Sequence, residues 1–399
     1  MSNFGVKSVG IKCPIIREGD DLVKIVVDSV LDATYDGKEF RQVQDNGTKE
    51  GYWTEEIKKY ALNDKDVIGV TESVVARAAG LYVTVSAIAN DIIKKFGPAP
   101  TICLTNMIYS RNRFSMILKG IARAAKKLIL VMEYEDEVGN PRGVNKFTGV
   151  DIEKYYTEIC EKENCEVEIL HQLRTSWNEN PNLIHPGIDY IKEKIDGFID
   201  CSLHINGLSG LALHSWYCFQ PLYTLKDICN NKNPDFGVLG SNKATEEKLK
   251  LFPTREIAQK FVEKVQAKLY EKTGKNVEVM VYGDGCFKDP IGGIWEFADP
   301  VTSPGYTKNG ILNGRPNEIK IKAFADDDFK DLKGAELDRA MKDAIKNKEK
   351  DLIGNMASQG TTPRRYVDLL ASLMDLTSGS GDKGTPIVLI QNYFNNYSD

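Results

Sequence analysis

A glycine-rich loop near the carboxyl terminus has the composition of an anion-binding segment. The stretch Thr377–Pro386 reads TSGSGDKGTP and carries Gly379, Gly381 and Gly384 together with one cation, Lys383. Glycine lets the backbone approach a ligand closely, and successive amide N–H groups can surround an anion, to which a lysine adds a point charge. The glycine spacing excludes a Walker A loop. The loop therefore indicates either an anion site or a mobile surface turn.

The residues on either side place this loop at the end of a sheet. A helix is predicted before it from an apolar stripe, and the run PIVLIQNYF after it predicts a buried strand. Ligands of α/β folds tend to bind where strands end. Arg364 and Arg365 stand at the start of the helix, where its dipole prefers negative charge. They indicate a nearby anion or, equally, two solvated side chains.

A second group of residues suits a hard cation. The strand predicted in VEVMVYGDG ends with Asp284 between two glycines, and Asp289, Glu296 and Asp299 follow closely. Magnesium and manganese prefer oxygen ligands, and carboxylates at a strand end can supply them. The alternative is an acidic tight turn in which Asp284 makes only local hydrogen bonds.

Composition excludes several classes of protein. The net charge of −5 gives no reason to expect nucleic-acid binding, and no apolar run is long enough to span a membrane. The amino terminus lacks the order of a signal peptide. The eight cysteines contain no CxxC pair, and the four histidines have no metal-ligand spacing. We expect reduced thiols and a cytoplasmic protein.

The elements that position these residues alternate between strands and helices. Strands are predicted at Val9–Ile16, Asp66–Thr71, Thr101–Tyr109 and Lys127–Glu135, with helices between them, and the pattern continues through the middle of the chain. Such alternation favours an α/β fold with a largely parallel sheet. We predict a discontinuous core, residues 1–135 and 276–399, interrupted by an inserted α/β domain at residues 136–275.

Several of these segments, in order, resemble the coenzyme F420-0:γ-glutamyl ligase family. The opening GIKCPIIREGDDL, the strand and helix DVIGVTESVVARAAG, the segment ICLTNMIYSRN and the strand VMVYGDGCF are similar to family motifs. The closing VDLLASLMDLTSGSGDKGTPIVLIQ is similar to the family's last helix, glycine loop and strand. The middle of the chain has no counterpart in the short ligases, so the chain resembles a longer branch with a ligase-like core.

The resemblance implies roles for particular residues. Arg77, in place of a family lysine, and Lys383 would be catalytic, and Asp284 and Asp289 would bind magnesium or manganese. The family's other metal aspartate falls on Tyr109, which is a poor ligand for these ions. The implied nucleotide-binding residues are Cys13, Pro14, Ile15, Ile16, Glu72, Ser73, Asn112, Arg364, Arg365, Ser378, Gly379, Ser380, Gly381, Asp382, Gly384 and Thr385.

The implied function is amide ligation driven by GTP or ATP, which adds glutamate or a similar amine to an activated carboxylate. The implied partners are the nucleotide, the small acid and the amine, and a second copy of the chain in a homodimer. Two alternatives remain open: a related ligase with other substrates, and a non-catalytic nucleotide-binding protein that has lost part of the metal site. An oxidoreductase ranks last because no GxGxxG follows a strand.

Overall fold

The computed structural model describes most of the 399-residue chain. The described residues are 5–34, 39–45, 48–54, 61–136, 140–145, 148–172, 194–202, 221–284, 301–308, 310–361, 364–378 and 382–398, of which 39–45, 48–54, 172, 284, 301 and 302 are described by their backbone alone. Within these ranges, no helix is both long and apolar enough to cross a membrane.

One five-stranded sheet brings the two ends of the chain together. Its order is β1 (Lys7–Ile11), β15 (Ile387–Gln391), β4 (Val67–Thr71), β13 (Glu278–Asp284) and β14 (Val301–Thr302). Strands β4 and β13 run parallel, and the other neighbouring strands run antiparallel. Every residue of β15 is buried, as expected for an apolar strand at the centre of a sheet that is covered on both faces.

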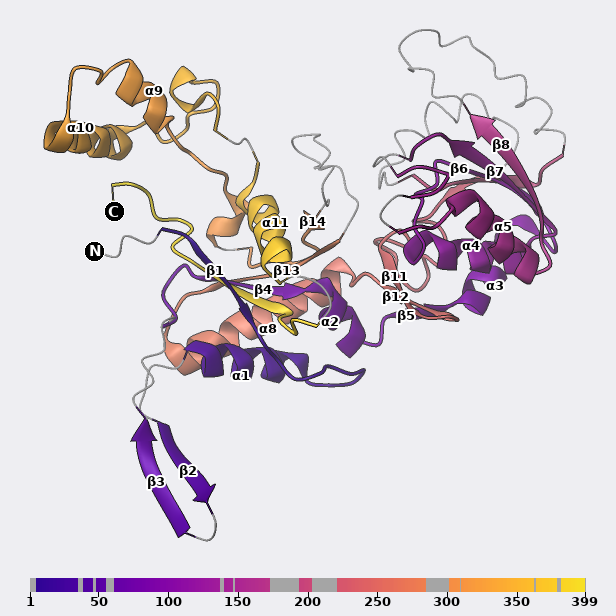
Figure 1. Cartoon of the computed structure of the whole chain (residues 1–399), viewed down its shortest axis with the longest axis horizontal. Helices are drawn as coiled ribbons and strands as arrows, with labels where there is room; N and C mark the ends of the chain where they lie inside the picture. Colours follow the sequence, from indigo (N-terminus) through magenta and orange to yellow (C-terminus); the bar gives the residue numbers. More distant parts are fainter. Residues whose placement is uncertain are drawn as a thin grey trace.

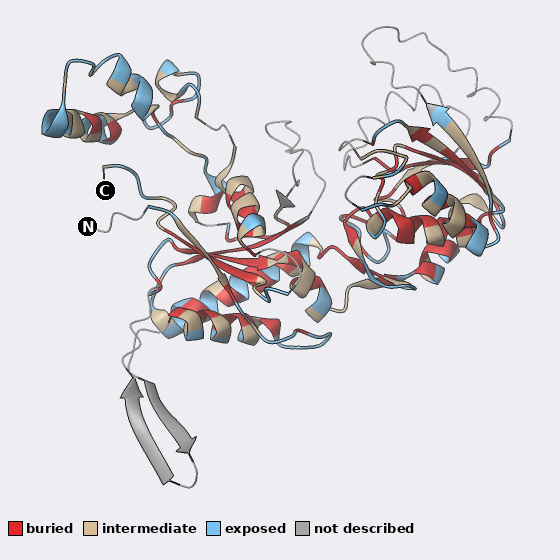
Figure 2. Ribbon diagram, viewed as in Figure 1, coloured by how far each residue is buried: buried red, intermediate tan, exposed pale blue. Residues whose placement is uncertain are grey.

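Helices cover both faces of this first sheet (Figure 1). On one face, α1 (Leu22–Thr34) and α8 (Arg255–Thr273) contribute to an apolar cluster with the strands. On the other face, α11 (Tyr366–Ser378) contributes to a second cluster. The short helix α2 (Glu72–Ala78) follows β4 directly. Figure 2 shows that buried residues concentrate in the strands and on the helix sides that face them.

A second five-stranded sheet is doubly wound. Its order is β10 (Leu222–Thr224), β9 (Gly197–Asp200), β6 (Thr101–Thr105), β7 (Lys127–Glu133) and β8 (Glu166–Gln172), and all neighbours run parallel. The chain therefore moves outward from β6 to β8, returns beside β6 as β9, and continues outward on the opposite side.

Three helices pack on the second sheet. These are α3 (Val85–Phe96), α4 (Arg113–Ala124) and α5 (Ile152–Lys162), whose apolar faces join one large cluster with the strands. A glycine allows α3 and α4 to approach closely, because a Cβ at Gly120 would lie 2.6 Å from Cγ2 of Ile88.

Smaller elements complete the chain. An antiparallel sheet of β11 (Ser241–Thr245), β12 (Lys248–Leu251) and β5 (Tyr82–Thr84) lies between the two larger sheets (Figure 1). The hairpin of β2 (Glu39–Asp45) and β3 (Thr48–Thr54) forms a separate two-stranded sheet. Helices α9 (Ile321–Asp326) and α10 (Gly334–Asn347) share a small apolar cluster. Two short 3-10 helices, η1 (Ile311–Asn313) and η2 (Met356–Ser358), are also present.

The predicted α/β class is confirmed, but several details differ from expectation. The first sheet is mostly antiparallel rather than largely parallel, and the strand expected at Thr101–Tyr109 ends at Thr105. The strand expected at Val9–Ile16 ends at Ile11, shortly before Pro14, which has no amide N–H to donate to a sheet. Strands β6 and β7 come from the segment assigned to the core, yet they pair with β9 and β8 from the segment assigned to the insertion. The sheet pairing therefore does not follow the expected division at residue 136.

Candidate functional site

A cavity of about 740 Å³, lined by both polar and apolar residues, lies at one edge of the first sheet. Its walls come from the loop after β1, the end of β4 with the start of α2, the β11–β12 hairpin, the end of α11, and the residues before β15. Many residues expected from the sequence line it: Cys13, Pro14, Ile15, Ile16, Glu72, Ser73, Arg77, Ser378, Gly384 and Thr385.

Strand direction explains why these distant segments meet. Strands β1 and β4 end at this edge, and β15, which runs antiparallel to both, begins there. The amide N–H of Thr71 donates to the carbonyl of Pro386 at 2.9 Å, which ties the two strand ends together. The Thr385 hydroxyl donates to the Ser378 carbonyl at 2.7 Å and so closes the base of the glycine loop.

The loop after β1 forms an apolar wall of the cavity. The side chain of Ile15 is exposed, whereas Ile16 is buried in the cluster beneath. Burial raises the pKa of the Cys13 thiol above its usual value. The following turn is fixed to the end of α2, because the amide of Gly19 donates to the carbonyl of Ala78 at 3.0 Å.

Opposite charges meet inside the cavity. The Lys250 ammonium lies 3.1 Å from Oε1 of Glu72, and the two residues are only 8% and 4% exposed. Glycine is required beside this pair, because a Cβ at Gly283 would lie 2.1 Å from Cγ of Glu72. Arg77 is exposed at the cavity, makes no ion pair with any described residue, and adds a second cation.

Sequence reasoning missed part of the lining. Lys250 and Asn242 come from the β11–β12 hairpin, and Thr71, Val74, Asp375, Leu376 and Pro386 come from elements already implicated. No local pattern marks Lys250, because its partner Glu72 lies 178 positions away. Thr71 and Pro386, by contrast, adjoin predicted site residues and could have been included.

Other expected residues lie outside the cavity. Asp382 and Lys383 are exposed beside it. Arg364 and Arg365 precede the opposite end of α11 from Ser378, and Arg365 pairs with Asp368 through two contacts of 3.0 Å. An aspartate in the first turn thus neutralises the charge of Arg365, for which either a nearby anion or solvent was expected.

Asn112 and Tyr109 belong to the second sheet. The side chain of Asn112 accepts a hydrogen bond from the amide of Arg113 and caps α4. The Tyr109 hydroxyl donates to the Glu133 carbonyl at 2.9 Å, and burial raises the pKa of this phenol well above its usual value. Neither residue lines the cavity. Gly379, Ser380, Gly381 and Asp289 lie outside the described residues.

The described side chains alone do not form a metal site. Among them, no three His, Cys, Asp or Glu side chains converge. The cavity carboxylates are Glu72 and Asp375, and Glu72 already contacts the Lys250 ammonium, which would repel a second cation. Asp284 ends β13 at the same edge, but only its backbone is described.

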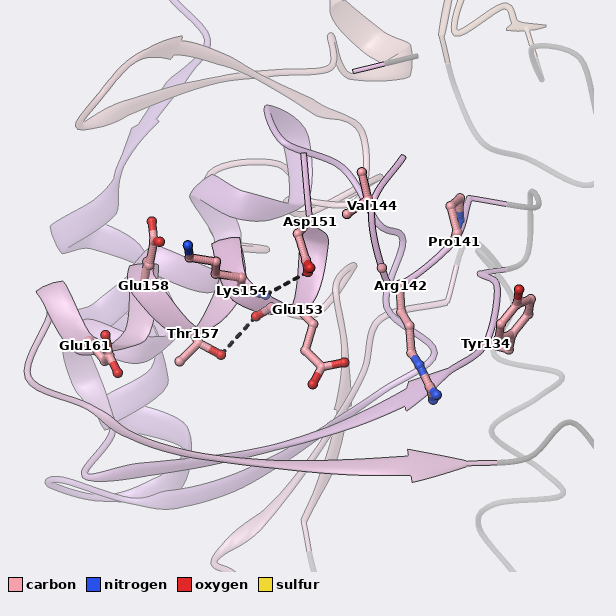
Figure 3. Close-up of a pocket in the computed structure, with 11 residues that line it drawn as sticks. Tyr134, Pro141, Arg142, Val144, Asp151, Glu153, Lys154, Thr157, Glu158 and Glu161 are labelled. Atoms are coloured by element: carbon pink, nitrogen blue, oxygen red, sulfur yellow. Dashed lines mark hydrogen bonds between the residues drawn. The ribbon is translucent and has the colours of Figure 1, made fainter. Parts of the chain in front are cut away.

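A second cavity, of about 700 Å³, runs along α5 on the second sheet (Figure 3). Its lining mixes cations, including Arg142 and Lys154, with carboxylates, including Glu153, Glu158 and Glu161. No residue expected from the sequence lines it. The first cavity is therefore the better candidate site.

The fold and this cavity define an α/β protein with charged residues in a cavity at the edge of a sheet. Residues 10–392 match the family model described as F420-0:Gamma-glutamyl ligase. The chain therefore belongs to the F420-0:gamma-glutamyl ligase family, a family of enzymes that form amide bonds.

Other comparisons add little. No curated protein matches the chain. A solved structure described as the crystal structure of PH0851 is 12% identical to it, with a TM-score of 0.17 over 72% of this chain and 48% of that one. The chain thus spans about half the length of this relative.

Proposed function

We propose that this chain is a nucleotide-dependent ligase that joins glutamate, or a similar amine, to a small carboxylic acid. The observation that supports the proposal is the cavity itself. It gathers residues of the segments 13–16, 71–77, 375–378 and 384–386. The family resemblance implicates residues of these same segments in the nucleotide site.

The proposed reaction has two steps. The carboxylate first takes the terminal phosphoryl group of GTP or ATP, which breaks a phosphoanhydride bond, forms an acyl phosphate and releases the nucleoside diphosphate. The amine then attacks the acyl carbon, the carbon–nitrogen bond forms, inorganic phosphate leaves and the nitrogen loses a proton. Both steps require the reactants to be positioned and the phosphate charge to be stabilised.

Several residues suit those tasks. The guanidinium of Arg77 is accessible at the cavity and can grip phosphate oxygens through two N–H groups. Ser73 and Thr385 offer hydroxyls, and we propose that Lys383 approaches the phosphates from the loop beside the cavity. Magnesium or manganese remains a proposed cofactor on Asp284 and Asp289, where it would supply further positive charge.

Calorimetric titration of GTP, and then of ATP, tests nucleotide binding with and without magnesium. We expect Arg77→Ala to raise the Kd about 10- to 100-fold, the range for losing a hydrogen bond to a charged group. Arg111→Ala is the matched control, because Arg111 is an exposed arginine outside the cavity and its loss should leave the Kd unchanged.

Turnover separates the remaining possibilities. Phosphate release that requires both an acid and an amine would support the ligase, whereas nucleotide binding without release in any such mixture would favour a non-catalytic binding protein. Absence of binding by either nucleotide would overturn the proposal. We also propose a homodimer, so light scattering should give twice the chain mass of 44.6 kDa, and a monomer mass would contradict it.

A further inference from the structure

A buried ammonium group in the cavity has fewer partners than it can use. Lys250 is 8% exposed and lines the cavity from β12. Its ammonium can donate three hydrogen bonds, but among the described residues it has one acceptor, Oε1 of Glu72 at 3.1 Å. Two donors are therefore left without a described protein acceptor.

Burial makes those donors significant. Removing a charged group from water is costly, and one carboxylate partner offsets that cost only in part. Glu72 is itself buried at the start of α2, so it holds the lysine in one place. An anion in the cavity would supply acceptors for the two remaining donors.

A neighbouring amide strengthens the case. Asn242 of β11 is the direct cross-strand partner of Lys250 in β12, and both residues line the cavity. Side chains of directly opposed residues lie on the same face of a hairpin. The hairpin thus presents an amide and an ammonium side by side, a pair that can donate to the several oxygens of one oxyanion.

We propose that Lys250, positioned by Glu72 and accompanied by Asn242, binds a phosphate group in the cavity. The proposal rests on the proposed function and adds a phosphate contact from the β11–β12 hairpin. The phosphate belongs either to the nucleotide or to a phosphorylated acid substrate. Arg77 reaches the same cavity from α2, so the phosphate would lie between one cation from this helix and one from the β11–β12 hairpin.

A purely structural role is the competing explanation. In that case the Glu72–Lys250 pair would only join α2 to β12, and any change that preserves folding would leave binding intact. Removal of Lys250 alone is a poor test, because Glu72 would remain buried beside no cation and the variant could unfold. The informative variants either keep both charges of the Glu72–Lys250 pair or remove both together.

The test uses the full-length protein and three variants. Lys250→Arg keeps the charge, whereas the double variant Glu72→Gln with Lys250→Gln removes both charges and keeps hydrogen-bonding groups of similar size. The control Lys243→Gln removes an exposed lysine of β11 that pairs with Glu246. Circular dichroism melting establishes that each variant is folded.

Calorimetric titration with GTP and, separately, with 2-phospholactate, which serves as a small phosphorylated carboxylic acid, identifies the source of the phosphate. We expect the double variant to bind one of these probes about 10- to 100-fold more weakly. Lys250→Arg and Lys243→Gln should stay within a few-fold of the wild type. The probe that loses affinity contains the phosphate that Lys250 contacts.

Three results would overturn the inference. These are wild-type affinity of the folded double variant for both probes, an equal loss in Lys243→Gln, and failure of the wild type to bind either probe. A wild type that binds 2-phospholactate through Lys250 but binds no nucleotide would preserve this inference while it overturned the proposed nucleotide dependence.

Discussion

At the scale of single residues, local spacing and tertiary contact contribute differently to the site. The Arg365–Asp368 pair could have been found from the sequence, because residues three apart on a helix face one another. That pairing would have weakened the case for an anion beside the arginines. The Glu72–Lys250 pair could not have been found, because it requires α2 and β12 to meet across 178 positions. Sequence patterns therefore predicted most of the cavity residues that come from the first sheet and its helices, and missed those that come from the β11–β12 hairpin.

The close approach of Gly283 to Glu72 gives a first prediction at this scale. We expect Gly283→Ala to destabilise the protein by about 1–3 kcal/mol, the usual cost of overpacking. The added methyl group would lie 2.1 Å from Cγ and 2.9 Å from Cβ of Glu72, and neither atom is the free end of a side chain. Urea unfolding gives the change in the free energy of unfolding.

A second glycine supplies the control for this prediction. A Cβ at Gly143 would meet nothing within 4 Å, so Gly143→Ala should change the free energy of unfolding by a few tenths of a kcal/mol at most. Equal effects of the two substitutions would show that the contact with Glu72 does not constrain the site.

At the scale of elements, local sequence signals predicted where helices and strands lie. They did not predict which strands pair with one another. The expected helix and strand near the carboxyl terminus are found as α11 and β15. Helix α8 is capped at its start by Thr254, whose side chain accepts from the amide of Ile257, and at its end by the left-handed Gly274, and both caps are local signals. Sheet order lacks such signals, because any apolar strand can in principle pair with several others.

The hairpin that carries Lys250 is attached to α4 by an ion-pair network. Glu247 lies 2.7 Å from Arg123 and 2.6 Å from Lys119. Hydrogen bonds from Arg123 and then Lys119 lower the pKa of Glu247 to about 2. The folded pKa is below the unfolded value of roughly 4.3, so the network stabilises the protein at neutral pH and loses its effect as pH falls from about 4 to 2.

This network gives the prediction at the element scale. Glu247→Gln should lower the free energy of unfolding by less than about 1 kcal/mol at pH 7, because the Glu247 side chain is 55% exposed and solvent screens its charge. The difference from the wild type should shrink towards zero as pH approaches 2. Chemical denaturation at a series of pH values measures both quantities.

Glu246→Gln is the matched control for this series. Glu246 is the neighbouring residue and pairs with Lys243 of the same hairpin rather than with α4, so its loss should matter less. A Glu247→Gln difference that grew on acidification would contradict the assigned direction of the pKa shift.

At the scale of the whole molecule, the candidate site draws on the first sheet and on the small sheet beside it. The apolar cluster of the second sheet includes Leu249 and Leu251 of β12, whereas Val75 of α2 belongs to a cluster of the first sheet. Lys250 lies between those two leucines in sequence and lines the cavity from the opposite face of β12. Successive side chains of β12 thus point alternately into the apolar cluster of the second sheet and into the cavity at the first sheet. A ligand in the cavity would therefore contact residues of the first sheet and of the β11–β12 hairpin.

Hydrogen exchange can locate the ligand across the whole chain. With saturating GTP, we expect slower amide exchange in residues 13–16, 71–77 and 375–378, and also in 241–251, because a phosphate held by Lys250 would restrain the hairpin. Protection of the first three segments without the hairpin would place the nucleotide in the cavity but away from Lys250. Protection at residues 151–161 would instead place the nucleotide in the cavity along α5, and the choice between the two cavities would then be reversed.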